Sequence, residues 1–215
     1  MVRKESKNSL RNIVYDSIIN DIIAGVYEPM DIITESALIE KYGVSKSPVR
    51  DALIELCKED ILVSMPRVGY RLALYSDYWF ESVIEFRALI EPYYLRKNWH
   101  KITPETIAQI ESSQKDTQSA IATTFVSGVI EHWLRNQEFH LSIARVCAPA
   151  YFYEVLEKTL KRLTIAYAQH YWSQWENKPF PLDVERHHKV IEAMKENKPD
   201  EACRYLSEDI QSFKY

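Results

Sequence analysis

The sequence predicts a mainly α-helical protein with two domains: a small N-terminal domain of three helices and a β-hairpin, and a larger C-terminal bundle of helices only. Two observations favour this fold class. The 215 residues include only 4 glycines, whereas average usage would give about 15, so tight turns and glycine-rich phosphate loops must be few. Apolar residues recur at helical spacing along most of the chain, and a strand-like pattern is confined to residues 61–74.

The N-terminal helices are indicated by their apolar stripes and by the residues at their ends. The first stripe covers residues 10–24. A second helix begins after Thr34, a good N-cap, and ends at Gly43, which can adopt the left-handed conformation that terminates a helix. A third helix follows at once, with Ser47 as its N-cap and Pro48 in its first turn. Two helices joined by so short a turn form a helix-turn-helix.

A hairpin and a long helical region complete the chain. Residues 61–65 and 70–74 form two strands around a turn at Pro66–Gly69, which makes a wing after the third helix. No glycine- or serine-rich linker follows, so we expect the domains to cover residues 1–75 and 77–215. The expected helices of the second domain are a stripe over 80–93, a helix starting at Thr103, one that begins after Gly128 and ends at Pro149, and segments over 151–175, 182–196 and 199–213.

Charge and cysteine content narrow the class of protein. The net charge is −4, and residues 1–75 hold 10 Lys and Arg against 11 Asp and Glu, so only modest non-specific attraction to DNA is expected. No uncharged apolar run of about 18 residues is present, and the charged N-terminus is not followed by the apolar run of a signal peptide. The three scattered cysteines are typical of free thiols in a reducing compartment. We therefore expect a cytoplasmic protein without a membrane partner.

Basic and hydroxyl side chains cluster at the beginning of the third helix. A recognition helix enters the major groove with this end first, and its dipole favours phosphate. Lys46 and Arg50 are four residues apart and can share a face, and Arg50 could bind guanine O6 and N7 or a phosphate. Arg67 and Arg71 of the wing could contact the DNA backbone or the minor groove. Solvated surface charge is the alternative interpretation. The candidate contacts on the helix are Ser45, Lys46, Ser47 and Arg50.

The segment from Gly43 to Leu53 reads Gly-Val-Ser-Lys-Ser-Pro-Val-Arg-Asp-Ala-Leu, and the wing reads Pro-Arg-Val-Gly-Tyr. Over residues 10–75 the chain thereby resembles the winged helix-turn-helix of the GntR family of bacterial transcription regulators. The resemblance implies double-stranded operator DNA as a partner and adds Ser36 and Gly69 to the candidate contacts. Lys46 stands where the family usually has arginine, which exchanges a bidentate donor for a point charge.

The second domain resembles the helical FCD effector domain of the FadR-type branch of that family, through Phe80–Pro92 and Asn136–Ile143. Many members of this branch bind a divalent metal through an Asp and a His four residues apart, followed by two His 22 residues apart. The matching positions here are Asn136, His140, His187 and Asp209. Two imidazoles and a carboxylate suit Zn²⁺, Ni²⁺ or Mn²⁺. A buried polar network of the same residues without metal is the alternative.

Effectors of this branch are often small carboxylates, which suit a cavity that contains arginine. Arg87 and Arg162 are the candidate effector contacts, and either could instead form a structural pair with Glu85 or Glu91. The leading hypothesis is a homodimeric, ligand-responsive regulator that represses a metabolic operon until its effector binds. It assigns no catalytic residue. The alternatives are a metal-dependent enzyme that uses the His140, His187 and Asp209 cluster, and a helical interaction module without DNA binding.

Overall fold

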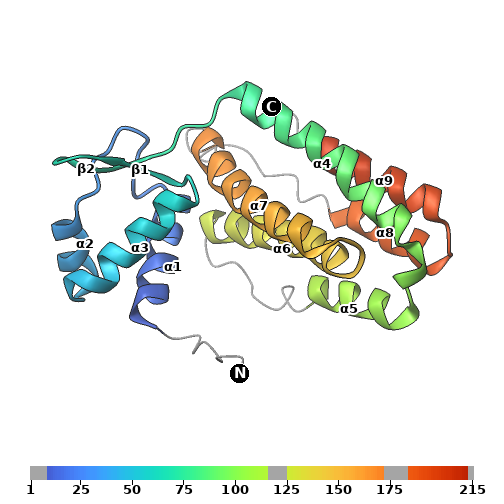
Figure 1. The fold of residues 1–215 in the computed structure, drawn as a ribbon. Coiled ribbons are helices and arrows are strands. Elements are labelled where there is room, and N and C mark those ends of the chain that lie inside the picture. The colour runs from blue at the N-terminus through green and yellow to red at the C-terminus, as the bar shows by residue number, and fades with distance from the viewer. Residues whose placement is uncertain (1–8, 116–124, 172–183, 213–215) are drawn as a thin grey trace. The chain divides into compact units, whose positions relative to one another are not determined.

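The computed structural model describes residues 9–115, 125–171 and 184–212. The chain divides into two compact units, and each is described below by itself. The first contains the residues up to Tyr75 together with the end of a long helix from Arg162, and the second contains Ser76–Lys161 and the last helices. The elements are shown in Figure 1. The prediction of a mainly helical protein with one small hairpin is confirmed.

Between residue 9 and Tyr75 the N-terminal unit forms three helices and one hairpin: α1 (Leu10–Ile23), α2 (Glu35–Tyr42), α3 (Lys46–Lys58), β1 (Leu62–Met65) and β2 (Gly69–Leu72). Helices α1 and α3 pack on each other. Burial of each large aliphatic side chain stabilises the fold by roughly 1.5–3 kcal/mol. The buried side chains come from all five elements and the loops between them, and include Val14, Ile18, Ile22, Ile33, Leu38, Val49, Leu53, Leu56, Ile61, Leu62 and Leu72.

The ends of α2 follow the sequence prediction. The Thr34 hydroxyl accepts a hydrogen bond from the Ala37 N–H at 3.2 Å, and Gly43 closes the helix with φ of 64°. The prediction that Ser47 caps α3 is wrong, because the helix starts at Lys46 and its N-cap is Ser45. Ser47 lies inside the first turn, where its hydroxyl donates to the Asp51 carboxylate at 3.5 Å.

The wing is joined to the residues just before α2. Strands β1 and β2 are antiparallel, with Leu62 opposite Leu72 and Met65 opposite Gly69. Tyr70 exchanges two backbone hydrogen bonds of 2.8 Å with Ile33. At Gly69 the backbone has φ of 146°, and a Cβ atom would lie 2.6 Å from the Ile33 carbonyl oxygen. Only glycine fits this close approach, so Gly69 is what allows the wing to pair with the segment before α2.

The described elements of the C-terminal unit are all helices: α4 (Asp77–Lys97), η1 (Trp99–Lys101), α5 (Pro104–Lys115), α6 (Phe125–Cys147), α7 (Ala150–Tyr171) up to Lys161, α8 (Val184–Lys195) and α9 (Pro199–Gln211). Helix α9 packs against both α4 and α8. The core between the helices includes Leu95, Ile110, Phe139, Ile143, Val190, Leu206 and Ile210. Gly128 was expected to precede a helix, but it lies inside α6. No helix in the described residues is long and apolar enough to cross a membrane.

Candidate nucleic-acid interface and metal centre

The predicted DNA contacts on α3 lie at its exposed N-terminal end. The four side chains are exposed and therefore accessible to a DNA duplex; they are Ser45, Lys46, Ser47 and Arg50. The carboxylate of Glu35, the first residue of α2, lies beside the two cations. One of its oxygens is 3.5 Å from Lys46 Nζ and the other is 3.3 Å from Arg50 Nε. Sequence reasoning did not identify Glu35, because its partners are 11 and 15 positions away on another helix.

The other predicted DNA contacts lie near the wing and at the start of α2. Arg67 is exposed at the tip of the hairpin, where its φ is 66°. Gly69 lies at the start of β2, where it allows the wing to approach Ile33 closely. Ser36 is exposed and its hydroxyl lies 3.1 Å from that of Thr34. The structure therefore places the predicted contacts on the first turns of α2 and α3 and on the wing.

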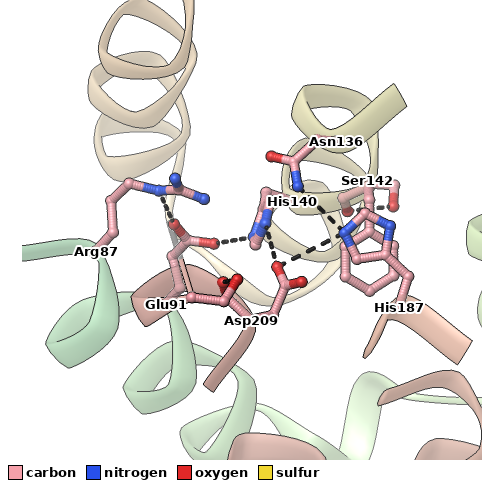
Figure 2. A network of polar contacts seen from close by, with 9 residues as sticks. Arg87, Glu91, Asn136, His140, Ser142, His187 and Asp209 are labelled. Carbon is pink, nitrogen blue, oxygen red and sulfur yellow. Dashed lines mark hydrogen bonds and ion pairs between the residues drawn. The ribbon is translucent and has the colours of Figure 1, made fainter. Parts of the chain in front are cut away.

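A cluster of buried polar side chains lies inside the C-terminal unit (Figure 2). Asn136 and His140 lie one turn apart on α6, and His187 and Asp209 come from α8 and α9. All four side chains are buried, and His140 is completely excluded from solvent. The spacing within α6 places two of these residues on one face, and the packing of α8 and α9 brings the other two to them.

The ligand-type atoms of the cluster face one another. An Asp209 carboxylate oxygen lies 3.1 Å from His140 Nε2 and 3.6 Å from His187 Nε2. One nitrogen or oxygen atom from each of these three residues lies within 4.8 Å of the other two. The Asn136 amide lies 3.3 Å from His187 Nε2. The His187 ring is held by stacking on Phe139, with ring centroids 3.8 Å apart. A single ion could reach all of these atoms.

Two residues of α4 extend the cluster. Arg87 Nε donates to one oxygen of Glu91 at 2.7 Å, and the other oxygen lies 2.7 Å from His140 Nδ1. This carboxylate therefore fixes the orientation of the imidazole and directs its Nε2 toward Asp209. Glu91 was expected only as a possible ion partner of Arg87. Its contact with His140 spans 49 positions and could not be read from a spacing.

The ionisation of the cluster follows from its pairings. Burial alone would raise the pKa of Glu91, but Arg87 and His140 outweigh burial and lower that pKa below its ordinary value. Burial would likewise raise the pKa of Asp209, and hydrogen bonds from His140 and His187 lower it. Burial would lower the pKa of His140, and the neighbouring carboxylates raise it. Without a metal, the two carboxylates thus favour the charged form of the His140 imidazole, whereas its burial and the Arg87 guanidinium oppose it.

Comparison with known proteins places both units in families. Residues 10–72 match the bacterial regulatory proteins of the gntR family, and residues 82–212 match the FCD domain. This chain belongs to the GntR family. The FCD domain assigns it to the FadR-like branch of that family, which is a family of DNA-binding transcription regulators. The family is one of transcription regulators and not of enzymes, so it does not support the hypothesis of a metal-dependent enzyme.

Two regulators are similar to this GntR-family chain in sequence. The HTH-type transcriptional repressor GlaR of Escherichia coli K12 is 26% identical over 140 residues, 65% of this chain and 64% of GlaR. The chain thus spans a little less than two thirds of that relative's length. The Nta operon transcriptional regulator of Aminobacter aminovorans is 23% identical over 189 residues, which cover 86% and 83% of the two chains.

Solved structures share the fold of this GntR-family chain. McbR/YncC of E. coli superposes with a TM-score of 0.74 at 20% identity, over 95% of each chain. A GntR regulator from Rhodococcus sp. RHA1 superposes with a TM-score of 0.71 at 14% identity, again over 95% of each chain. At these identities the likeness shows the fold alone.

The two predicted effector arginines of this GntR-family chain have different surroundings. Arg87 is 2% exposed and is joined to His140 through Glu91. Arg162, on α7, donates from Nε to the Glu59 carbonyl oxygen at 2.8 Å and pairs with the Asp60 carboxylate. The structure therefore joins Arg87 to the four predicted metal ligands and gives Arg162 other partners.

Proposed function

We propose that this regulator is a homodimeric repressor of a metabolic operon, and that a small carboxylate bound in the FCD domain releases it from DNA. The observation that carries the proposal is the exposed basic and hydroxyl end of α3 in a chain whose second domain encloses a polar cluster with two carboxylates, two imidazoles and an arginine. The similarity to a protein named as a repressor supports the direction of regulation. An effector shifts the equilibrium between DNA-binding and released states by binding one of them more tightly.

Removal of the Arg50 guanidinium tests the DNA-binding surface. With the intergenic DNA upstream of the chain's own gene as probe, Arg50→Ala is expected to weaken binding about tenfold to a hundredfold, because one base or phosphate contact at a recognition helix is lost. Arg11→Ala is the matched control, since Arg11 is an exposed arginine of α1 paired with Glu55. Equal affinity of Arg50→Ala and wild type in a gel-shift titration would contradict the assignment.

The dimer is proposed from symmetry and from an exposed apolar stripe. Two-fold related chains match two half-sites of a palindromic operator. On α4, large apolar side chains at helical spacing remain exposed, although apolar surface of this kind is usually covered by a partner; they are Tyr78, Phe86, Leu89 and Tyr93. Sedimentation of the complexes formed in the gel-shift titration should give two chains per duplex, and a single chain per duplex would contradict the dimer.

We infer that the buried cluster holds one divalent ion, Zn²⁺, Ni²⁺ or Mn²⁺, through His140 Nε2, His187 Nε2 and an Asp209 oxygen. The convergence of these three atoms within 4.8 Å supports the inference. A flip of the Asn136 amide would direct its oxygen toward the ion as a fourth ligand. Glu91 would hold His140 in the tautomer that leaves Nε2 free. When bound, such an ion supplies positive charge and a coordination position for an effector oxygen.

Replacement of one imidazole tests the ligand set. His187→Ala is expected to lower Zn²⁺ affinity at least a hundredfold in a competition titration against a chromophoric chelator, because a buried nitrogen ligand is removed. His188→Ala is the control, since His188 is the next residue but is exposed. Equal Zn²⁺ affinity of the two variants would contradict the assignment, and a wild-type protein that competes for no Zn²⁺, Ni²⁺ or Mn²⁺ would favour the metal-free network.

The proposed effector is a small carboxylate. Arg87 Nη2 is buried and has no hydrogen-bond partner among the described residues, so a donor remains available for an anion. A small cavity lies beside Glu91 and His140 and is otherwise lined mainly by apolar side chains such as Ile143 and Phe152. Its volume of about 10 Å³ has room for roughly one water molecule, so it would have to widen to admit a carboxylate. Arg162, the second predicted contact, pairs with Asp60 and does not line this cavity.

A thermal-shift panel of small mono- and dicarboxylates on metal-loaded protein tests the effector class. A ligand at a hundred times its Kd stabilises the native state by about 2.7 kcal/mol, which is a readily measured rise in Tm. Stabilisation by a neutral or cationic panel, with none by carboxylates, would contradict the proposed class.

A further inference from the structure

The acidic side chain of Glu35 lies between the cations of the recognition helix. Its carboxylate contacts Lys46 Nζ and Arg50 Nε through separate oxygens, at 3.5 and 3.3 Å. The Lys46 and Arg50 side chains are 63% and 56% exposed, whereas the Glu35 side chain is 23% exposed. The two cations can therefore move toward a duplex, while the carboxylate stays in the domain surface.

Glu35 is held in this position by three elements. It is the first residue of α2, directly after the N-cap Thr34, where the helix dipole favours a negative charge. Ile33, two residues before Glu35, is paired with Tyr70 of the wing. Burial and the nearby Glu35 charge raise the pKa of the Tyr70 hydroxyl, and Arg50 opposes this effect. The carboxylate thus lies where α2, α3 and the wing meet.

A fixed carboxylate at this place opposes binding to phosphate. Non-specific binding depends on neutralising phosphates with Lys and Arg, and both cations at the start of α3 would have to leave Glu35 to do so. At a correct site a guanidinium can form bidentate hydrogen bonds with a base edge, and these can offset the loss of its contact with Glu35. A phosphate in DNA of arbitrary sequence does not provide this base contact. Among acidic residues of α3 itself, Asp51 lies near these cations in sequence but contacts Ser47, so it does not take the place of Glu35.

We propose that Glu35 is a specificity-determining residue of the DNA-binding domain, which lowers affinity for DNA of arbitrary sequence by engaging Lys46 and Arg50 until a correct site displaces it. The proposal depends on the DNA binding that the family shows, and not on the repressor, metal or effector proposals. Glu35 is one of the 11 acidic residues that offset the 10 Lys and Arg of residues 1–75.

The test measures the affinity of the full chain for a duplex of random sequence, about 30 base pairs long, by fluorescence anisotropy over a range of KCl concentrations. Glu35→Gln is expected to bind this duplex about threefold to tenfold more tightly at low salt, which corresponds to the loss of two exposed ion pairs. The slope of log K against log salt should become steeper by about 0.9 for each additional phosphate that the variant neutralises.

Glu40→Gln is the matched control. Glu40 lies on the same helix, is exposed, and makes no salt bridge within the part of the chain that the structure describes. The substitution Glu40→Gln removes the same charge as Glu35→Gln, and it should change the affinity for the duplex less than about twofold. Unchanged or weaker binding by Glu35→Gln, or an equal increase in affinity in Glu40→Gln, would overturn the proposal.

A second background separates the specific contacts from a general charge effect. In a chain that already carries Lys46→Gln and Arg50→Gln, adding Glu35→Gln should not increase the affinity further, since its partners are absent. An increase as large as in the wild-type background would overturn the proposal as well. Far-ultraviolet circular dichroism of every variant establishes that the comparison is made between folded proteins.

Discussion

Glu91→Leu is expected to lower the free energy of unfolding of the C-terminal domain by about 3–5 kcal/mol, because it leaves a buried cation without its partner. Arg87 is 2% exposed, and Glu91 accepts its only hydrogen bond among the described residues. The same substitution removes an acceptor from His140. Urea unfolding followed by tryptophan fluorescence reports this domain through Trp79, Trp99 and Trp133, which belong to it.

The control is the double variant Arg87→Met/Glu91→Leu, measured in the presence of a chelator so that metal affinity does not enter the comparison. Replacing both charges by apolar side chains of similar size should restore most of the lost stability. If the double variant is as unstable as Glu91→Leu alone, the loss comes from packing and not from the unpaired cation.

Gly69→Ala is expected to destabilise the N-terminal domain by about 2–4 kcal/mol, because its Cβ would meet the Ile33 carbonyl oxygen at 2.6 Å and its φ of 146° is unfavourable for alanine. The wing would have to separate from Ile33, and DNA affinity should fall with it. Amide hydrogen exchange over residues 61–74 measures the effect locally.

Gly43→Ala is the comparison for this substitution. Gly43 also has a positive φ, 64°, but nothing lies within 4 Å of a Cβ placed there. It should therefore lose only the roughly 1–2 kcal/mol of a left-handed residue. Arg67 already adopts such a conformation at φ of 66° in the same domain. Equal destabilisation by the two variants would show that the close approach to Ile33 is unimportant.

The local structure of the N-terminal domain was predictable because its signals are short in range. Thr34 and Gly43 mark the ends of α2 by the hydrogen bond and the left-handed conformation that the structure contains. Ser45 and Ser47 are both suitable caps, so the N-cap of α3 was misplaced by two residues. Gly128 gave a wrong boundary because one glycine costs a helix only about 1 kcal/mol, and α6 continues through it.

The candidate sites were predictable only where spacing or family resemblance carried them. Asn136 and His140 are four residues apart, so one helical turn places them on the same face. The position of Asp209 beside them depends on the packing of α9 against α4 and α8. The roles of Glu35 and Glu91 depend on contacts between helices, which leave no periodic signal in the chain. Such acidic residues become visible only when the structure shows which cation or imidazole each one faces.

The position of the polar cluster on α4 has a mechanical consequence. Arg87 and Glu91 belong to the helix that begins at Asp77, shortly after β2 ends at Leu72. A helix advances about 1.5 Å per residue, so Glu91 lies roughly 20 Å along the axis from the first residue of α4. Because its carboxylate contacts both Arg87 of the same helix and His140 of α6, any shift of α4 against α6 would have to stretch the contact between Glu91 and His140.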